Sequence, residues 1–573
     1  MAEGDVVALY AARTVELVPL LVGIMESGAT FALLDPAHPP ARLRAQMAAV
    51  KPSLLIWSEE AGPLPEIIAG VGINVSQASR LLGAPEGSAP MPSARAVRPS
   101  YIMFTSGSTD LLPRAVISGS ASLAHFLSRY VSEFDIGRDS RFALLSGLGH
   151  DPLLRDVFTP LCVGGELHVP DVELRRDPLA LLRWLAKRRI TVLHLTPPLA
   201  RLLAMAAVES GIRLPDVRLI CYGGDILRYG DVKAVTAIMP SAQHVNFYGT
   251  TETPQAMAFH VINPKEVGLA ADGAPVPIGR GIKDVQILVI NNSGQLAGIG
   301  EIGEIVVRTP FLAKGYINAS DTGGFQLDPT PGTRRFETGD RGRYLSDGSV
   351  ETLGRIDRQV KVMGFRVDLT EIDAACMRLP GIDRAVTVAR SSTGEAIRLT
   401  TYALPIDGSE SAVDQLCADL AALLPEYMIP HEVIKISDIP LTPNGKIDYR
   451  ALPSVASISG PDDLRGSEGD LEEAIRNIWK SVLVVSDVAP DGNFFDCGGT
   501  SLLMVQVQSL LRERLGVSLE LVALFKYPSI GSLARHLESA AIPSLAVSVQ
   551  RHERRRSHSA VRIKRRQHRG ESS

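Results

Sequence analysis

One serine near the end of the chain stands where it could carry a covalently attached group. The run Asn493-Phe-Phe-Asp-Cys-Gly-Gly-Thr-Ser501 places two hydroxyls after a Gly-Gly turn, and Leu503, Val507 and Leu510 then recur at helical spacing. This pattern predicts a helix N-terminus, where a hydroxyl is exposed and backbone N–H groups favour an anion such as phosphate. An ordinary Ser/Thr helix cap would give the same pattern.

A second candidate is a loop rich in serine, threonine and glycine that follows an apolar run. It reads Phe104-Thr105-Ser106-Gly107-Ser108-Thr109. Small residues let the backbone approach an anion, and the hydroxyls add donors. The spacing is not that of a Walker A loop. A surface Ser/Gly loop would look the same, so the interpretation depends on the motifs that accompany it.

Five further motifs follow this loop in order along the chain. They are Asn246-Phe-Tyr-Gly-Thr-Thr-Glu252, Thr338-Gly-Asp340, Gly354-Arg-Ile-Asp357 running on to Arg366, Leu424 to Pro430, and Asn444-Gly-Lys446-Ile-Asp448. Taken alone, Thr-Gly-Asp and Asn-Gly-Lys would be ordinary turns. Six such motifs in one order make coincidence implausible.

In this order the motifs resemble those of the adenylate-forming enzymes: acyl-CoA synthetases, luciferases and the adenylation domains of non-ribosomal peptide synthetases. The run ending at Ser501 resembles the attachment site of peptidyl carrier proteins. The resemblance covers almost the whole chain apart from its basic tail. It points to a peptide-synthetase adenylation domain followed by its own carrier domain.

The resemblance also implies roles for individual residues. Ser501 would carry 4′-phosphopantetheine, and Asp357 would be the hinge. Glu252 would bind Mg²⁺ and, with Lys446, be catalytic, because a hard cation prefers carboxylate oxygens and an ammonium can bridge a carboxylate and a phosphate. The implied ATP and AMP contacts are Thr105, Ser106, Gly107, Ser108, Thr109, Arg114, Asn246, Tyr248, Gly249, Thr251, Asp340 and Arg355.

A further set of residues aligns with the substrate pocket of that family. Asp151 matches the aspartate that holds the α-amino group in amino-acid-activating members, which favours an amino acid over a fatty or aryl acid. Arg155 and His194 could meet a polar or acidic side chain, although Arg155 could instead pair with Asp156 or Asp151. The positions aligned with the pocket wall are Pro152, Arg155, His194, Ile220, Tyr222, Phe247, Gln255 and Ala256.

These residues must be positioned by an α/β fold. Up to about residue 350, short apolar β-type runs alternate with helical patterns, as where 192–195 precedes 199–207 and 217–220 precedes 230–238. This alternation predicts largely parallel sheets with helices. Hairpin signals begin near Glu301, with a tight turn at Asp347-Gly348.

The predicted organisation has five parts. Residues 1–356 form the adenylation core, with parallel sheets, helices and a small β-barrel, and 357–451 form a small, mobile α+β subdomain. Residues 452–468 are a linker, 469–540 a four-helix-bundle carrier domain and 541–573 a basic, disordered tail. The segment at 24–36 resembles one normally found deeper in the family's domain, so the core is expected to be incomplete at its N-terminus.

Composition bounds the class of protein. The chain has 573 residues, 45% hydrophobic and 21% charged, with no apolar run of membrane-spanning length and no signal-peptide pattern. Five scattered cysteines argue against a zinc site or a disulfide framework and suit the cytoplasm.

The C-terminal tail is basic. From residue 551 onward there are nine basic residues, two acidic residues and no aromatics, which predicts a solvated tail rather than a nucleic-acid site. An electrostatic dock for an acidic partner enzyme is the second interpretation of that tail.

The phosphate loop departs from the family pattern, which continues Thr-Gly-x-Pro-Lys-Gly. Here Asp110 replaces the glycine, one residue is inserted and Arg114 stands in place of the lysine. A carboxylate near a triphosphate should weaken its binding, and an arginine differs from a lysine in geometry.

The expected activity is ATP- and Mg²⁺-dependent activation of an amino acid and its transfer to the pantetheine thiol on Ser501, in the biosynthesis of a natural-product peptide. The expected partners are a phosphopantetheinyl transferase and downstream condensation enzymes acting in trans, without nucleic acid or membrane.

The altered loop motivates an alternative, a carrier protein with an impaired adenylation domain that is loaded by another enzyme. A free acyl-CoA or aryl-acid ligase is a third interpretation, and Asp151 and the fused carrier count against it.

Overall fold

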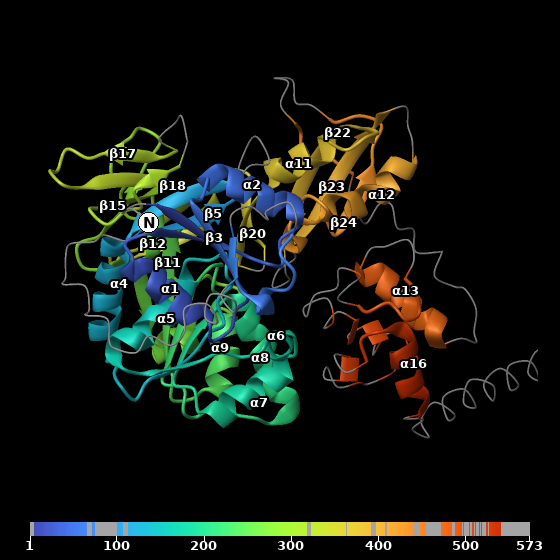
Figure 1. Cartoon of the computed structure of the whole chain (residues 1–573), viewed down its shortest axis with the longest axis horizontal. Helices are drawn as coiled ribbons and strands as arrows, with labels where there is room; N and C mark the ends of the chain where they lie inside the picture. The colour runs from blue at the N-terminus through green and yellow to red at the C-terminus, as the bar shows by residue number, and fades with distance from the viewer. Residues whose placement is uncertain are drawn as a thin grey trace, which may run out of the picture. The chain divides into compact units, whose positions relative to one another are not determined.

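The computed structural model describes two compact units, residues 1–459 and 460–573. The described residues are 5–65, 72–74, 100–106, 113–317, 323–362, 364–390, 397–406, 410–440, 447–453, 471–483, 488–494, 497, 504, 507, 508, 510, 511, 515, 517, 519, 523, 524 and 527–539. No helix among them is long and apolar enough to cross a membrane. Figure 1 shows the elements of both units. Each unit has its own hydrophobic core.

The first sheet of the larger unit has seven strands, in the order β16-β6-β5-β2-β1-β3-β4. Five of them run parallel: β1 (Val6–Tyr10), β2 (Thr30–Leu34), β3 (Leu54–Trp57), β4 (Gly72–Asn74) and β5 (Ser100–Thr105). The antiparallel edge consists of β6 (Arg114–Gly119) and β16 (Gly315–Tyr316). Helices α1 (Leu17–Glu26) and α2 (Pro40–Val50) connect the first three strands. All five residues of β2 are buried, as expected for a parallel strand covered on both faces.

The second sheet also has seven strands, in the order β13-β12-β11-β10-β9-β7-β8. Its parallel strands are β7 (Arg141–Ala143), β8 (Glu166–His168), β9 (Val192–Leu195), β10 (Leu219–Tyr222) and β11 (Gln243–Thr250). Its antiparallel edge is β12 (Thr253–Ile262) and β13 (Arg280–Gly281). The helices are α4 (Ser120–Glu133), α5 (Pro152–Val163), α6 (Val172–Arg176), α7 (Pro178–Arg188), α8 (Pro197–Ser210), α9 (Tyr229–Ile238) and α10 (Pro264–Leu269).

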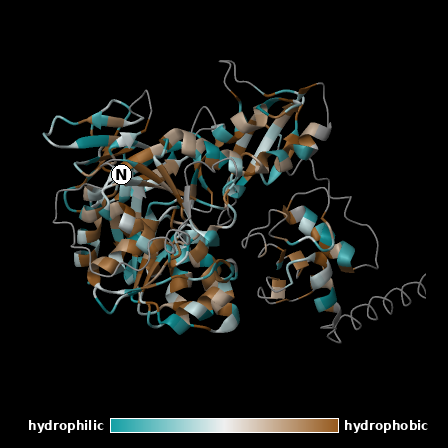
Figure 2. Ribbon diagram, viewed as in Figure 1, coloured by the Kyte–Doolittle hydropathy of each residue, from teal (hydrophilic) through white to brown (hydrophobic). Residues whose placement is uncertain are grey.

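The predicted alternation of strands and helices is confirmed in this sheet, where β9 leads into α8 and β10 into α9. Both seven-stranded sheets are nevertheless mixed rather than parallel throughout. Each gains its antiparallel edge where two consecutive strands, β5–β6 or β11–β12, are joined too closely in sequence for the crossover that a parallel pair requires. Figure 2 shows the hydrophobic residues concentrated in the strands and on one side of many helices.

A third, antiparallel sheet stands where the sequence predicts hairpins and a small β-barrel. Its strands are β14 (Gln286–Ile290), β15 (Ile302–Thr309), β17 (Phe325–Leu327), β18 (Arg334–Tyr344) and β19 (Val350–Arg355), and both β17 and β19 pair with β18. The tight turn predicted at residues 347–348 joins β18 to β19, with Gly348 at φ +82°. This turn brings Asp340 of β18 into register with Arg355, the last residue of β19.

The C-terminal part of the larger unit is α+β, as predicted. The hairpin of β20 (Gln359–Val362) and β21 (Phe365–Asp368) leads into α11 (Leu369–Met377). A three-stranded sheet of β22 (Ile382–Arg390), β23 (Arg398–Pro405) and β24 (Glu432–Lys435) follows, with α12 (Glu410–Ala421) between its last two strands. A buried ion pair between Arg42 of α2 and Glu371 of α11 links this part to the first sheet.

The smaller unit is described mainly through α13 (Leu471–Leu483) and α16 (Ile530–Ser539). The apolar stripe of the first of these helices is buried at Ile475, Ile478 and Val482. Trp479 lies edge-on against Phe494, with ring centroids 4.8 Å apart. These two helices are described where the sequence predicts a four-helix bundle, and Ser501 lies outside the described residues.

Candidate functional site

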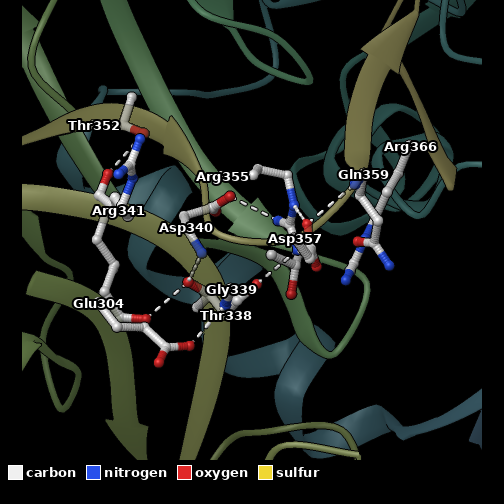
Figure 3. A network of polar contacts seen from close by, with 12 residues as sticks. Glu304, Thr338, Gly339, Asp340, Arg341, Thr352, Arg355, Asp357, Gln359 and Arg366 are labelled. Atoms are coloured by element: carbon white, nitrogen blue, oxygen red, sulfur yellow. Dashed lines mark hydrogen bonds and ion pairs between the residues drawn. The ribbon is translucent and has the colours of Figure 1, made fainter. Parts of the chain in front are cut away.

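A buried carboxylate, that of Asp340 on β18, lies at the centre of a polar network (Figure 3). Its two oxygens accept from the Tyr248 hydroxyl at 2.7 Å and from Nη1 of Arg355 at 2.6 Å. Burial, followed by the charge of Asp340, raises the pKa of Tyr248, so this phenol stays protonated and donates. The β18–β19 hairpin, together with Tyr248 of β11, thus holds the Asp340 carboxylate at a fixed position.

Arg355 connects this carboxylate to Asp357. Its Nε and Nη2 donate to the two oxygens of Asp357 at 2.7 and 2.8 Å, a bidentate geometry that restricts both side chains. Figure 3 shows Arg355 between Asp340 and Asp357, with Gly339 beside them. Gly339 has φ +73°, and a Cβ there would lie 2.7 Å from Nη2 of Arg355, so any other residue would strain the backbone and displace the guanidinium.

A cavity of about 190 Å³ opens beside Asp340. Its wall is partly apolar, through Phe247, Val276 and Ile278, and partly polar. The polar residues lining it are Asp225, Asn246, Tyr248, Asp340, Thr352, Arg355, Gln359 and Lys361. A partly apolar cavity with a carboxylate in its wall suits a nucleoside, whose base packs on apolar groups and whose sugar hydroxyls donate.

Glu252, in the turn between β11 and β12, is a second buried carboxylate, only 1% exposed. It accepts from the Tyr316 hydroxyl at 2.8 Å and from Nη1 of Arg366 at 2.9 Å. Burial by itself would raise the pKa of Glu252, but Arg366 and Tyr316 outweigh it and hold that pKa below its ordinary value. The group is therefore an anion at neutral pH.

The fit of Glu252 to Mg²⁺ follows from its chemistry. Within the described ranges no three His, Cys, Asp or Glu side chains gather as a metal site. Mg²⁺ commonly binds through one or two carboxylates plus substrate phosphates and water, so a single anionic carboxylate is sufficient. In this structure the same carboxylate is paired with Arg366.

Arg366 comes from the β20–β21 hairpin. Its backbone carbonyl accepts from the Ser106 hydroxyl at 3.0 Å, and its Nε donates to Gln359 at 2.5 Å. Phe365 of the same hairpin packs on His150 and Tyr427, with ring centroids 4.2 and 3.9 Å apart. The hairpin is thus fixed against the phosphate loop and Glu252 at the same time.

Asp151 lies at the N-cap of α5 and is a third buried carboxylate. Its Oδ2 accepts from the Gln255 backbone N–H at 2.8 Å, and the Gln255 side chain returns a hydrogen bond to its carbonyl at 2.8 Å. Burial, opposed by that backbone hydrogen bond and by Arg155, raises the pKa of Asp151 to about 6. An ammonium ion is the partner that such a carboxylate lacks.

A second cavity, of about 240 Å³, lies by the start of α5. Pro152, Arg155 and His194, which the sequence aligns with the pocket wall, line it. The His194 ring bonds to Asp156 through Nδ1 and to the Tyr130 hydroxyl through Nε2, at 2.7 Å. Burial lowers the pKa of His194 despite Asp156, so this imidazole does not supply a positive charge at neutral pH.

Two of the predicted wall residues face away from this cavity. Tyr222 bonds to His244 at 2.8 Å, and Ile220 lies on the same side of β10. Their neighbour Cys221 points the other way, with its sulfur 3.6 Å from the Tyr130 hydroxyl that also bonds to His194. Ile220 and Tyr222 therefore line neither described cavity, and a shift of one position along β10 would move a side chain to the opposite face of the strand.

The structure places the remaining predicted residues as follows. Phe247 lines the cavity beside Asp340, and Gln255 binds Asp151, whereas Ala256 is buried and lines neither described cavity. Arg114 begins β6 and lies over the Tyr316 ring, Thr105 ends β5, and Thr251 belongs to the turn that carries Glu252. Outside the described residues lie Gly107, Ser108, Thr109, Lys446 and Ser501.

Sequence reasoning missed Arg13, His150 and the role of Arg366. Arg13 and His150 line the second cavity, and Nη1 of Arg13 donates to the Leu145 carbonyl at 2.8 Å. Arg366 lay inside a quoted motif, but nothing in that motif indicates Glu252 as its partner. No local pattern marks these three side chains, because their neighbours come from distant parts of the chain.

Comparison with known proteins gives two family matches. Residues 1–317 match the AMP-binding enzyme family, and residues 473–537 match the phosphopantetheine attachment site. The first match includes the altered loop after Thr109, and it does not favour the alternative of an impaired adenylation domain.

The curated relatives are longer proteins. An L-2-aminoadipate reductase of Schizosaccharomyces pombe is 33% identical over 93% of this chain, which spans 44% of that protein. A dimodular nonribosomal peptide synthase of Bacillus subtilis is 33% identical over 96% of this chain, which spans 23% of that protein. The chain thus spans less than half the length of either relative.

Among solved structures, a holo non-ribosomal peptide synthetase protein containing adenylation and PCP domains, bound to a vinylsulfonamide inhibitor, is similar throughout. Its TM-score is 0.74 at 28% identity, covering 94% of this chain and 88% of that one. The α/β adenylate-forming fold predicted from the sequence is thereby confirmed.

Proposed function

Because this chain belongs to the AMP-binding enzyme family and also contains a phosphopantetheine attachment site, we propose that it activates an amino acid and loads it onto its own carrier domain. The family implies ATP and Mg²⁺, and the attachment site implies a covalent 4′-phosphopantetheine. When bound, that group supplies a thiol that accepts an acyl group as a thioester.

The proposed first reaction is adenylation. An oxygen of the substrate carboxylate attacks the α-phosphorus of ATP, and the bond to the β-phosphate oxygen breaks, which releases pyrophosphate. The electron pair of the broken bond leaves with pyrophosphate, where Mg²⁺ neutralises it. The product is an acyl-adenylate, and AMP leaves when the acyl group is transferred.

The observation that carries this proposal is the placement of three buried carboxylates with different partners. Asp340 accepts two hydrogen bonds beside a partly apolar cavity and suits the ribose of ATP. Glu252 is the anion that suits Mg²⁺, and Asp151 suits the ammonium of an amino acid. Holding two reactants in register removes much of the entropic barrier to their reaction.

The roles of individual residues are part of the proposal. Asn246 and Tyr248 contact the adenosine, Thr105, Ser106 and Arg114 the phosphates, and Lys446 bridges the carboxylate and the α-phosphate. Asp357 is the hinge about which residues 357–451 turn between the two reactions. Ser501 is the attachment point of 4′-phosphopantetheine.

We also propose where the product goes. A phosphopantetheinyl transferase loads Ser501, and enzymes acting in trans in the cytoplasm take the aminoacyl group onward. The peptide synthase among the relatives supports a role in non-ribosomal peptide assembly, and the reductases support an amino acid of the aminoadipate type as substrate.

Intact mass spectrometry of the full chain tests the proposal. After a phosphopantetheinyl transferase and CoA, then Mg-ATP and an amino-acid panel, we expect a pantetheine increment followed by an aminoacyl increment. Ser501→Ala should abolish both increments but keep ATP–pyrophosphate exchange. Lys446→Ala should lose exchange and keep the pantetheine increment. A wild-type chain that gains pantetheine but exchanges no pyrophosphate with any amino acid would contradict the proposal.

A further inference from the structure

A buried ion pair joins the two parts of the larger unit that the proposed mechanism moves relative to each other. Arg42 lies on α2 in the core, Glu371 lies on α11 within residues 357–451, and Nη1 of Arg42 donates to Oε1 of Glu371. The two side chains are 5% and 0% exposed. They stand 329 positions apart in the sequence, so the pair forms only where α11 packs against α2.

Glu371 is connected closely to the hairpin that reaches Glu252. Strand β21 ends at Asp368, and α11 begins at the next residue without an intervening loop. The Asp368 carboxylate caps the helix by accepting from the Thr370 backbone N–H at 2.9 Å. A contact that fixes α11 therefore also fixes Arg366, two residues before the cap.

The ion pair differs from the contacts of the hairpin itself. Arg366 contacts Glu252 and Ser106, which are proposed to bind Mg²⁺ and phosphate, so those contacts change with the ligand. Arg42 and Glu371 line neither described cavity. The pair therefore influences the orientation of residues 357–451 without competition from the nucleotide.

The charges of this pair make it reversible. Taking two charges out of water is costly, and their attraction compensates only where further hydrogen bonds satisfy both groups. Among the described residues, the buried Nε of Arg42 has no hydrogen-bond partner, so that compensation is incomplete. Turning about Asp357 separates the two side chains, and the separated charges regain water. The pair thus adds little net stability to the orientation seen here and allows the subdomain to leave it.

Loss of one partner has a different effect. The remaining charge is buried without its counter-charge in this orientation but is hydrated after the turn, so the equilibrium shifts toward the other orientation. Loss of both charges removes that penalty. An uncharged pair would bury apolar surface in this orientation and hold it more firmly.

We propose that Arg42 and Glu371 form a reversible latch, an ion pair that selects the orientation in which the carrier is loaded and that opens when the subdomain turns for adenylation. Both are positioning residues, because they act through the hairpin and touch neither described cavity. This inference rests on the proposed function, since it requires two half-reactions and a turn about Asp357.

Two rates measured on the full holo chain test the latch. Quench-flow gives the single-turnover rate of carrier loading from preformed adenylate, and isotope exchange gives the rate of adenylation. Arg42→Met and Glu371→Gln should each lower loading about tenfold or more, while exchange is unchanged or faster. The double variant Arg42→Met/Glu371→Met should load within about threefold of the wild type, and its exchange should be slower than in either single variant.

The matched control is Arg201→Met. Arg201 pairs with Asp231 at 3.4 Å, and that carboxylate is 7% exposed, but both residues belong to the core and keep their positions when the subdomain turns. This substitution also removes one partner of a partly buried pair, so it should lower stability without altering the ratio of loading to exchange.

Two results would overturn the inference and leave the proposed function intact. One is a ratio of loading to exchange that the single variants change no more than the control does. The other is a double variant that loads no faster than the single variants, because the effect of each substitution would then not come from an uncompensated buried charge.

A distance measurement decides the inference if no amino acid supports exchange, a result that would contradict the proposed function instead. Spin labels at Arg44→Cys on α2 and Met377→Cys on α11, both at exposed positions, report the separation of the two helices by double electron–electron resonance. Arg42→Met should deplete the separation seen here, and the double variant should restore it. A distribution of distances that Arg42→Met leaves unchanged overturns the inference. In the labelled chain serine replaces the three cysteines that are not buried: Cys162, Cys417 and Cys497.

Discussion

Replacing Arg366 by alanine should separate the two half-reactions. Arg366 donates to Glu252 at 2.9 Å, where the carboxylate is 1% exposed, and its backbone binds Ser106. A hydrogen bond between charged groups contributes about 1.5 to 3 kcal/mol net. Because 1.4 kcal/mol is a factor of ten, the population with the β20–β21 hairpin on Glu252 should fall by about 10- to 100-fold.

The consequence follows from the competition for Glu252. The carboxylate cannot bind Arg366 and Mg²⁺ equally well, so the arrangement seen here suits the step after pyrophosphate and Mg²⁺ have left. Arg366→Ala should therefore lower the single-turnover rate of carrier loading by about 10- to 100-fold. ATP–pyrophosphate exchange should be unchanged or faster, because Mg²⁺ loses its competitor.

Quench-flow with intact-mass detection measures loading from preformed adenylate, and isotope exchange measures adenylation. Arg343→Ala is the matched control, because Arg343 forms a pair of similar length with Glu351, 2.7 Å, but lines neither described cavity. If exchange falls as much as loading, or falls while loading is preserved, Arg366 acts in adenylation and the reasoning is wrong.

Four further substitutions test the site. Gly339→Ala and Gly332→Ala both place a Cβ at positive φ, +73° and +75°, and each should lose about 1 to 2 kcal/mol of unfolding free energy. Only Gly339→Ala should raise the KM for ATP, because nothing lies within 4 Å of a Cβ at position 332. The kcat/KM for the amino acid should fall about tenfold per pH unit below pH 6, because protonated Asp151 cannot pair with an ammonium. If Asp151→Asn leaves this pH profile unchanged, Asp151 is not the titrating group. Tyr248→Phe removes one of the two donors to Asp340 and should reduce unfolding free energy by about 1.5 to 3 kcal/mol in urea titrations, and an unaltered KM for ATP would argue against a ribose site there.

The elements that carry the site could be predicted where a sequence pattern is long and local. The β9–α8 and β10–α9 units follow from short apolar runs that precede helical periodicity, and the turn before β19 follows from Asp-Gly. Motif residues quoted from three separate segments, Asn246, Tyr248, Asp340 and Arg355, line one cavity. The spacing of these residues alone does not predict that they share a cavity. The order of the motifs does, because it carries the resemblance to the family.

The misses have a different physical origin. The side of β10 that faces the cavity depends on register, which a run of consecutive apolar residues does not encode because both faces of the strand are buried. The contact between Arg366 and Glu252 joins residues 114 positions apart, and its formation depends on how the hairpin packs. The burial of Arg155 beside the Phe247 ring, with no hydrogen-bond partner for its Nε among the described residues, is likewise a property of the assembled core.

The altered phosphate loop differs from the family pattern in the charges that it carries. Arg114, in place of the family's lysine, lies 5.3 Å above the ring of Tyr316, whose hydroxyl donates to Glu252. Arg114 therefore still places a positive charge beside Tyr316, the residue that contacts the carboxylate proposed for Mg²⁺. Asp110 and the inserted residue lie outside the described residues. The charge of Asp110 opposes those of Arg114 and of the metal ion that neutralises a triphosphate, and the family match that spans this loop does not favour an impaired domain.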